Sequence, residues 1–492
     1  MRVDRSVTTP LKGAPLSNAG TAVLNAARGR LAIRRQLATT PGRLRTACTL
    51  LAVGAIVFGF VAAHAAGERA QAVQSVRMTE PLLVSAVDLS ASLSDAHKVA
   101  AFSFLAGGPE PATTRRRYAQ ALQKAGAGVA KLAGEIGTSS RGDTGVRQIT
   151  QKLPIYAGFI GNARANNRQG FPVGNAYLRR ASTTMRDEIL IAARDLYKIQ
   201  AQGLTKSYRA GVAMSTVAAV LAAGGAMLVV LLAAQVYIAR ATHRIVNPHL
   251  ALATTVLLGL VAWIVVALAL QQRDLVRAQR VGSDPVELLT ATRILASRAQ
   301  ANESIALAAR GGGEGEPRLG TVDTGFQAVI APIGIARPGP AIGSRGLLDE
   351  AAVNAGRAPG ATGAIDRIYG AYRAYREAHD RVVKWEKQGN FTKAVKLAVG
   401  GDAARPAPTR DAAGLPSCVR RGSAGPMSTR AAADALNCLL MEEVRHARGR
   451  FADAASGAGG ALRGLPAGIP LLTALCALLA LFGVRQRLKE YR

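Results

Sequence analysis

The chain has 492 residues, a mean hydropathy of +0.15 and only 4% aromatic residues. Such an alanine-rich composition favours helices and excludes a protein built mainly of Val, Ile and Tyr strands. The net charge of +31 does not indicate nucleic-acid binding, because no basic helix carries interleaved aromatic residues. Only 12 of the 62 basic residues are lysines, so the charge reflects a general surplus of arginine.

The N-terminal region combines a basic tail with an apolar run. Residues 1–46 hold nine basic side chains against one acid, Asp4, and this composition predicts a cytoplasmic tail attracted to anionic membrane lipids. Residues 47–66 are long and apolar enough to form a first transmembrane helix. Because Ala63, His64 and Ala65 resemble a signal-peptidase site, cleavage of this run is the alternative.

Residues 67–210 carry four apolar stripes with spacings of three and four residues, at 82–100, 118–136, 146–160 and 185–199. Turn-forming sequences separate the stripes. The pattern predicts an up-and-down four-helix bundle, and an even number of helices returns the chain to the side on which it began. Pro154 is expected to kink or locally break the third helix.

Two further apolar runs, residues 211–239 and 250–270, predict transmembrane helices 2 and 3. The connector, residues 240–249, contains arginines and no acid, which places it in the cytoplasm by the positive-inside rule. The flanking segments, residues 67–210 and 271–464, are therefore expected to be extracytoplasmic.

Residues 271–464 are interpreted as a diverged copy of residues 67–210. The sequences TEP at 79–81 and GG at 107–108 correspond to SDP at 283–285 and GG at 311–312, both at an offset of 204 residues. Tyr156 corresponds to Tyr375 at an offset of 219. Repeated correspondences in the same order predict an internal duplication. The stretch 400–426 is expected to be a loop insertion in the second copy.

The cysteines fall into two pairs. Cys48 and Cys476 lie inside apolar runs and are expected to pack among membrane helices. Cys418 and Cys438 lie in the second extracytoplasmic segment, where a disulfide between them could persist. The sequence leaves open whether they pair.

Residues 465–484 predict transmembrane helix 4, and the basic residues 485–492 place the C-terminus in the cytoplasm. The predicted fold is thus mainly α, with four transmembrane helices and two extracytoplasmic domains that resemble four-helix bundles. No phosphate-binding loop, metalloprotease motif, nucleophile elbow or dinucleotide fingerprint occurs. We therefore expect no enzyme activity, no cofactor and no metal, and a receptor that signals to a separate cytoplasmic protein.

Three stretches carry a family resemblance: residues 164–182 (RANNRQGFPVGNAYLRRAS), 242–248 (THRIVNP) and 487–492 (RLKEYR). With the four-pass layout, they resemble the actinobacterial GlnX-like membrane proteins. The resemblance implies a link between an extracytoplasmic glutamate- and aspartate-binding lipoprotein and the cytoplasmic serine/threonine protein kinase G. It implies no catalytic residue.

A turn between the third and fourth helices of the first domain is the candidate contact with the outer partner. The candidate residues are Asn166, Asn167, Arg168, Gly170 and Phe171. The alternative is that they only cap and turn helices. The candidates for contact with the inner partner are Arg240, Arg244 and Pro248, which could equally serve as anchors to membrane lipids.

Two other functions are consistent with the sequence. In the first, a chemoreceptor-like bundle binds a small anionic ligand directly, with Arg115, Arg116 and Arg117 as candidates. In the second, the protein is a cell-envelope scaffold without a signal. A homodimer is compatible with all of these functions, and the ligand is not identified by the sequence.

Overall fold

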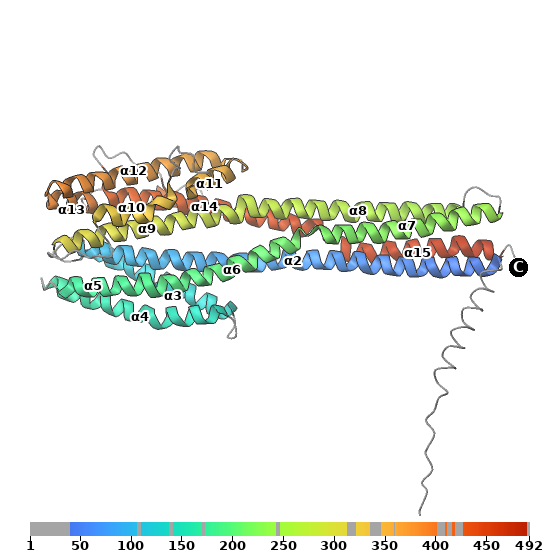
Figure 1. Ribbon diagram of the computed structural model, residues 1–492, viewed down its shortest axis with the longest axis horizontal. Coiled ribbons are helices and arrows are strands. Elements are labelled where there is room, and N and C mark those ends of the chain that lie inside the picture. The colour runs from blue at the N-terminus through green and yellow to red at the C-terminus, as the bar shows by residue number, and fades with distance from the viewer. Residues whose placement is uncertain are drawn as a thin grey trace, which may run out of the picture. The chain divides into compact units, whose positions relative to one another are not determined.

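The computed structural model describes residues 40–105, 110–136, 141–169, 173–242, 247–311, 321–334, 346–358, 360–400, 409–410, 416–418 and 427–489. The mainly α fold predicted from composition is confirmed (Figure 1). Within the described residues, the only strands are β1 (Thr409–Arg410) and β2 (Pro416–Ser417), which pair antiparallel.

The chain divides into two compact units. We call residues 1–67, 214–268 and 463–492 the membrane unit, and residues 68–213 and 269–462 the bundle unit. The bundle unit has a first half (68–213) and a second half (269–462). Both halves belong to one compact unit, and the four candidate membrane spans link the two units along the chain.

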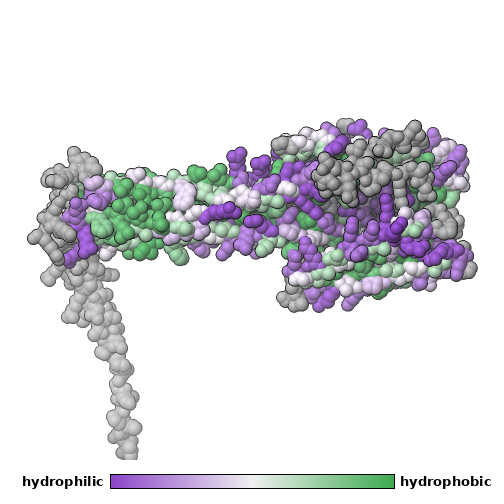
Figure 2. All heavy atoms as spheres, turned by 180° about the vertical axis from the view of Figure 1, so that it is seen from behind, coloured by the Kyte–Doolittle hydropathy of each residue, from purple (hydrophilic) through white to green (hydrophobic). Residues whose placement is uncertain are grey.

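The membrane unit contains the start of α2 (Thr40–Leu105), α7 (Met214–Thr242), most of α8 (Pro248–Ala278) and α15 (Leu465–Lys489). Each belongs to a helix long and apolar enough to cross a membrane. Large apolar side chains such as Phe60, Val229 and Phe482 are exposed on these helices. In the space-filling view, hydrophobic residues cover much of the surface of the apolar helices (Figure 2). An outward-facing apolar surface is stable when lipid tails surround it, and this supports a multi-pass membrane protein.

Two of the four links between the units are unbroken helix. Helix α2 continues past residue 67, and α8 continues through the π-helical turn η2 (Gln279–Ser283) into α9 (Asp284–Gly311). The other two links contain a break in the helix. Two residues separate the end of α6 (Leu190–Gly211) from the start of α7, and three separate the end of α14 (Thr429–Ala461) from the start of α15 at Leu465.

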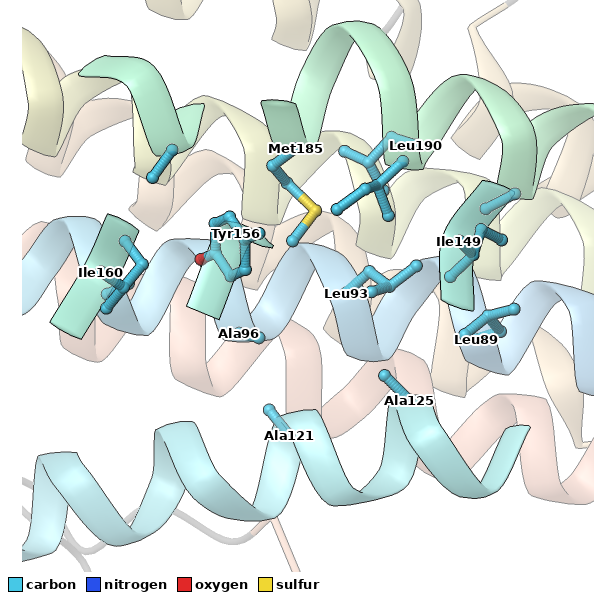
Figure 3. Close-up of a cluster of buried hydrophobic side chains, with 14 of the residues drawn as sticks. Leu89, Leu93, Ala96, Ala121, Ala125, Ile149, Tyr156, Ile160, Met185 and Leu190 are labelled. Carbon is cyan, nitrogen blue, oxygen red and sulfur yellow. The ribbon is translucent and has the colours of Figure 1, made fainter. Parts of the chain in front are cut away.

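The first half of the bundle unit is built from the four predicted helical segments. They are the second part of α2, α3 (Ala112–Ile136), α4 (Arg141–Arg168), and a composite of α5 (Val173–Thr183), the π-helical η1 (Thr184–Ile189) and α6. In their core, Leu93 from α2, Tyr156 from α4 and Met185 from η1 point toward one another (Figure 3). The predicted stripes thus face a common core.

Helix α4 passes through Pro154 without the expected local break. The side chain of Pro154 lies on the exposed face of the helix. Proline removes one backbone N–H and leaves a carbonyl one turn earlier without its partner. On an exposed face water can bind that carbonyl, so the helix continues on both sides of the proline.

The second half combines long and short helices. The long helices are α9, α12 (Ala361–Lys387) and α14, and the shorter elements are α10 (Val322–Ile330), the 3₁₀ turn η3 (Ala331–Ile333), α11 (Leu347–Ala355) and α13 (Phe391–Val399). Local caps determine where several begin. Ser428 Oγ accepts a hydrogen bond from Ala431 N at 3.2 Å, and Asn390 Oδ1 accepts one from Lys393 N at 3.2 Å.

Cys418 and Cys438 form a disulfide with a Cα–Cα distance of 5.8 Å. The bridge joins a residue before α14 to the third turn of that helix. Most of the predicted insertion at 400–426 lies outside the described residues. Cys48 and Cys476 are free thiols in α2 and α15.

The two halves share hydrophobic cores. Ala301 and Ile305 of α9 belong to the core of the first half, and Leu105 of α2 packs in a cluster with Ala306 and Leu307 of α9. The segment of α9 from 301 to 307 therefore contributes to the core of both halves. This shared apolar packing explains why they form one compact unit.

Gly282 in η2 is a position where a methyl group cannot be added without displacing the backbone. A Cβ there would lie 2.5 Å from Phe451 Cβ and 2.8 Å from Phe451 Cα of α14. We expect Gly282→Ala to lower the free energy of unfolding by about 1–3 kcal/mol through overpacking. Gly126→Ala, at an exposed helical site with open space, is the matched control and should raise it by up to about 1 kcal/mol. Chemical denaturation of both variants tests the pair, and equal effects would contradict the prediction.

Candidate functional site

The predicted outer contact residues lie mainly within a helix. Asn166, Asn167 and Arg168 form the last turn of α4, and not the turn after it as the sequence predicted. Asn166 Nδ2 donates a hydrogen bond of 2.8 Å to the carbonyl of Asn162 in the same helix. Gly170 and Phe171 lie outside the described residues. The bond of Asn166 is the one expected of a residue that stabilises its own helix end.

The predicted inner contact residues lie near the ends of α7 and α8. Arg240 is exposed near the end of α7, and Pro248 is the exposed first residue of α8. Arg244 lies outside the described residues. Beside them, Asn247 Nδ2 donates a hydrogen bond of 2.9 Å to the carbonyl of Gly483 in α15. This bond joins the start of α8 to α15 within the membrane unit.

The arginines proposed for direct anion binding have acidic neighbours. Arg115 lies 4.0 Å from Glu110, and Arg117 lies 3.3 Å from Asp434 of α14. All three side chains, including that of Arg116, are exposed. Because two of the three charges already face a carboxylate, this surface is a poor candidate for an anion site.

A polar cluster joins the two halves of the bundle unit. Asp95 of α2 accepts hydrogen bonds from Arg293 Nη2 at 2.5 Å and from Ser297 Oγ at 3.1 Å, both on α9. Lys98 Nζ lies 3.4 Å from the same carboxylate. Arg293 Nε in turn donates to Asn437 Oδ1 of α14 at 2.6 Å. One carboxylate thus connects α2 to α9, and Arg293 extends the connection to α14.

The Asp95 carboxylate is held in its charged form. Burial alone would raise its pKa, but Lys98, Arg293 and the hydrogen bond from Ser297 together lower it below the ordinary value. The side chains of Asp95 and Arg293 are 20% and 14% exposed, so solvent screens the pair only weakly. These side chains therefore form a charge-assisted hydrogen-bond network. Because they are mostly buried, water can replace few of its hydrogen bonds.

Other polar contacts extend along the same interface. Arg448 Nη2 of α14 lies 3.0 Å from both oxygens of Asp88 in α2. Tyr208 of α6 and Ser283 of η2 are joined by a hydroxyl hydrogen bond of 2.8 Å. The pKa of Tyr208 is raised, chiefly by burial, so its hydroxyl stays protonated. The two halves are therefore linked by polar contacts along much of their length.

Each half also buries a histidine. His97 of α2 packs edge-on against Tyr156, with its Nε2 3.3 Å from Ser182 Oγ. His379 of α12 contacts Glu303 of α9 through Nδ1 and stacks on Phe326 with ring centroids 3.5 Å apart. Within the residues that the structure describes, no group of three His, Cys, Asp or Glu side chains could hold a metal ion.

Arg69 of α2 binds the helix end that precedes the break between α6 and α7. Its side chain is fully buried, and its guanidinium donates to the carbonyls of Gly211 and Ala213, the latter at 2.5 Å. Gln271 Oε1 accepts from Arg69 at 3.3 Å, and Gln271 Nε2 donates to the Gly211 carbonyl at 3.2 Å. A cation at a helix C-terminus stabilises the exposed carbonyls there.

Asp95, Arg293 and Arg69 were not predicted as functional residues from the sequence. A faint signal existed, because Asp95 is a charged residue inside an apolar stripe and Arg69 follows an apolar run by three residues. Nothing in the sequence paired either residue with its partner, which lies more than a hundred residues away.

These features define a multi-pass helical membrane protein whose polar bundle unit is built from two connected halves. Residues 71–209, which make up almost the whole first half, match the family model described as an actinobacterial sensor domain. The match supports an actinobacterial sensor protein. No curated protein and no solved structure matches the chain.

Proposed function

We propose that this protein is a non-enzymatic transmembrane sensor. In this proposal the bundle unit is extracytoplasmic, both termini are cytoplasmic, and glutamate or aspartate availability is reported by an extracytoplasmic amino-acid-binding lipoprotein. The signal passes to a cytoplasmic serine/threonine protein kinase. The observation that carries the proposal is that a segment similar to a sensor domain is attached to membrane spans at both of its ends.

The helix pattern supports a route for the signal. Since α2 is continuous from residue 40 to residue 105, a displacement of its outer part can move its membrane part. The basic connector around Arg240 supports a cytoplasmic location for the ends of α7 and α8. The resemblance of residues 164–182 and 242–248 to GlnX-like proteins supports the lipoprotein and the kinase as partners.

The same pattern supports an internal duplication. In each half the first helix continues unbroken from a membrane span, and the last helix is separated from the next span by a break. Tyr156 and Tyr375, which correspond in the proposed alignment, are both fully buried in the cores of their halves. Two copies of one helical unit account for both observations.

A phosphorylation experiment tests the function. The gene is deleted, and phosphorylation of the kinase substrates is followed after addition of glutamate or aspartate. We expect the response to be lost in the deletion strain and restored by the wild-type gene. An unchanged response in the deletion strain would refute the proposed role. Partners that crosslink to the protein regardless of nutrient state would favour a scaffold instead.

Reporter fusions test the orientation independently. Alkaline phosphatase fused after residue 350 is expected to be active, because the second half should be extracytoplasmic. Fusions after residues 245 and 492 are expected to be inactive. The reverse pattern would overturn the proposed topology while leaving the fold unaffected.

A further inference from the structure

The last helical segment of the first half lies antiparallel to α9 in a defined register. Asn175 Nδ2 of α5 donates to the carbonyl of Ala308 at 3.5 Å, and Tyr197 of α6 contacts Glu287 through its hydroxyl. Between these two contacts, η1 and the start of α6 lie alongside α9. These two contacts therefore determine which residues of α9 lie opposite the residues of η1 and α6.

This register places two arginines opposite each other. Arg186 lies 11 residues after Asn175 and 11 before Tyr197, while Arg298 lies 10 residues before Ala308 and 11 after Glu287. Both side chains are half-buried, and Arg194 lies two turns beyond Arg186 on the same segment. Arg186 and Arg298 thus face each other where η1 lies against α9, and the charge of the exposed Arg194 also acts on Arg298.

Arg186 and Asp187 have interactions of their own, but Arg194 and Arg298 form no ion pair and no hydrogen bond among the described residues. The charge of Asp187 acts on Arg298. Other acids of these helices have their own partners, since Glu188 lies 2.5 Å from Lys152 and Asp195 lies 3.7 Å from Lys198.

The neighbouring arginine charges lower the pKa values of groups on both sides of the contact. The pKa of Arg298 is lowered, first by burial and then by the neighbouring charges of Arg194 and Arg186, with Asp187 acting in the opposite direction. Behind the arginines, burial together with Arg186 and Arg298 lowers the pKa of His97 to about 3. His97 is therefore neutral, and its Nδ1 has no hydrogen-bond partner in the described part of the chain.

A purely structural role does not explain this arrangement. Like charges that face each other across packed helices destabilise the contact unless an anion lies between them. Arg186 also lies in a π-helical turn, and such turns are frequent at functional sites because they change the direction of the side chains that follow. Guanidinium groups bind carboxylate and phosphate oxygens through paired hydrogen bonds.

We propose that Arg186, Arg194 and Arg298 bind a small oxyanion, a dicarboxylate or a phosphate, at the contact between the two halves of the bundle unit. The bound anion neutralises the cluster and tightens the contact between η1, α6 and α9. The site belongs to neither half alone, because Arg298 comes from the second half and the other two arginines from the first. Occupancy of the site would therefore change how the two halves pack against each other.

This inference deepens the proposed function and rests on it only for the claim that the anion acts as a stimulus. Binding itself can be measured without the kinase. If binding fails while the phosphorylation response requires the protein, the stimulus arrives through the partner lipoprotein instead. If binding succeeds while the response does not require the protein, the proposed function fails and the site remains.

Calorimetric titration of the full-length protein in detergent micelles tests the site. The probes are sodium phosphate, sodium succinate and sodium glutamate, each at an ionic strength held constant with sodium chloride. We expect saturable binding of at least one probe to the wild type, and the three arms distinguish a phosphate from a dicarboxylate. Saturable binding of none of them would overturn the proposal.

Three variants locate the site. Arg298→Gln and Arg194→Gln are expected to weaken binding at least tenfold, and Arg194 is exposed, so its loss should leave the fold intact. Arg373→Gln, which removes an exposed arginine from α12, is the matched control and should bind like the wild type. Equal weakening in Arg373→Gln would show that the probe responds only to overall charge, and would overturn the proposal.

Thermal unfolding provides a second test, because the site predicts different effects of Arg298→Gln on the melting temperature with and without the probe. Without a probe, Arg298→Gln should melt at a higher temperature than the wild type, because it removes repulsion among the arginines. With the binding probe, the melting temperature of the wild type should rise and that of Arg298→Gln should not. A variant that melts lower without the probe and responds to it like the wild type would contradict the inference.

Discussion

Asp95→Asn is expected to lower the free energy of unfolding of the bundle unit by about 3 kcal/mol at neutral pH, because it leaves Arg293 largely buried without its anion. This loss is at the lower end of what breaking a buried ion pair costs, because the Asp95 side chain is still 20% exposed to solvent. The variant also weakens the hydrogen bond from Ser297, now 3.1 Å long. The loss should be accompanied by faster hydrogen exchange along the contact between α2 and α9.

The effect of Asp95→Asn should depend on pH in a definite direction. The pKa of Asp95 is lower in the folded protein than in the unfolded chain. Its charge therefore contributes stability that is fully present above the unfolded pKa of about 4 and is lost as the pH falls through the folded pKa. The difference between wild type and variant should shrink below about pH 4.

The two tryptophans, Trp263 in α8 and Trp385 in α12, allow the measurement to be confined to the bundle unit. In a Trp263→Phe background, fluorescence of Trp385 reports chemical denaturation of that unit. Asp195→Asn is the matched control, because its ion pair with Lys198 is 59% exposed on both sides and should contribute less than about 1 kcal/mol. Equal losses for the two aspartates would contradict the role given to Asp95.

Arg69→Met is expected to release the end of α6 from α2. Methionine keeps an unbranched apolar chain but cannot donate to the carbonyls of Gly211 and Ala213, which the arginine now binds. Leaving buried carbonyls without donors costs about 1–3 kcal/mol each, partly offset here by the hydrogen bond from Gln271 to Gly211. Amides of the last turn of α6 should exchange at least about tenfold faster, which corresponds to 1.4 kcal/mol of local stability.

Arg77→Met provides the control for Arg69. Arg77 lies eight residues later in α2, and its side chain is exposed. We expect hydrogen exchange in α6 to be unchanged in that variant. If the protein is the proposed sensor, Arg69→Met should also alter the phosphorylation response to glutamate, whereas Arg77→Met should not. Unchanged exchange near Gly211 in Arg69→Met would show that Arg69 does not hold this helix end.

The helices could be predicted because their signals are local. Apolar runs of about 20 residues marked all four candidate spans, and the stripe containing Leu89 and Leu93 marked a helix whose apolar face is buried. The local break considered at Pro154 was wrong, because the sequence alone did not show that the proline would lie on an exposed face, while a kink there stays a prediction. The π-helical turns η1 and η2 were also missed, since they depend on packing rather than on local preference.

The polar contacts could not be predicted, because they join distant parts of the chain. Asp95 and Arg293 are separated by 198 residues, and no motif signals that they meet. The register that places Arg186 opposite Arg298 likewise depends on how two halves pack, and this packing involves the shared segment of α9 around Ala301. By contrast, the candidates chosen from the sequence, such as Asn166 and Arg115, were exposed polar groups near turns.

The core that the two halves share has a practical consequence for work with fragments. A recombinant piece limited to residues 71–209 would lack Ala301 and Ile305, which fill part of its hydrophobic interior, and would present Asp95 to solvent without Arg293. Such a piece would expose an apolar surface that α9 covers in the whole protein, and it would therefore self-associate readily. Soluble expression trials should therefore splice residues 68–213 to 269–462 through a designed linker, and not truncate the chain after the segment that resembles a sensor domain.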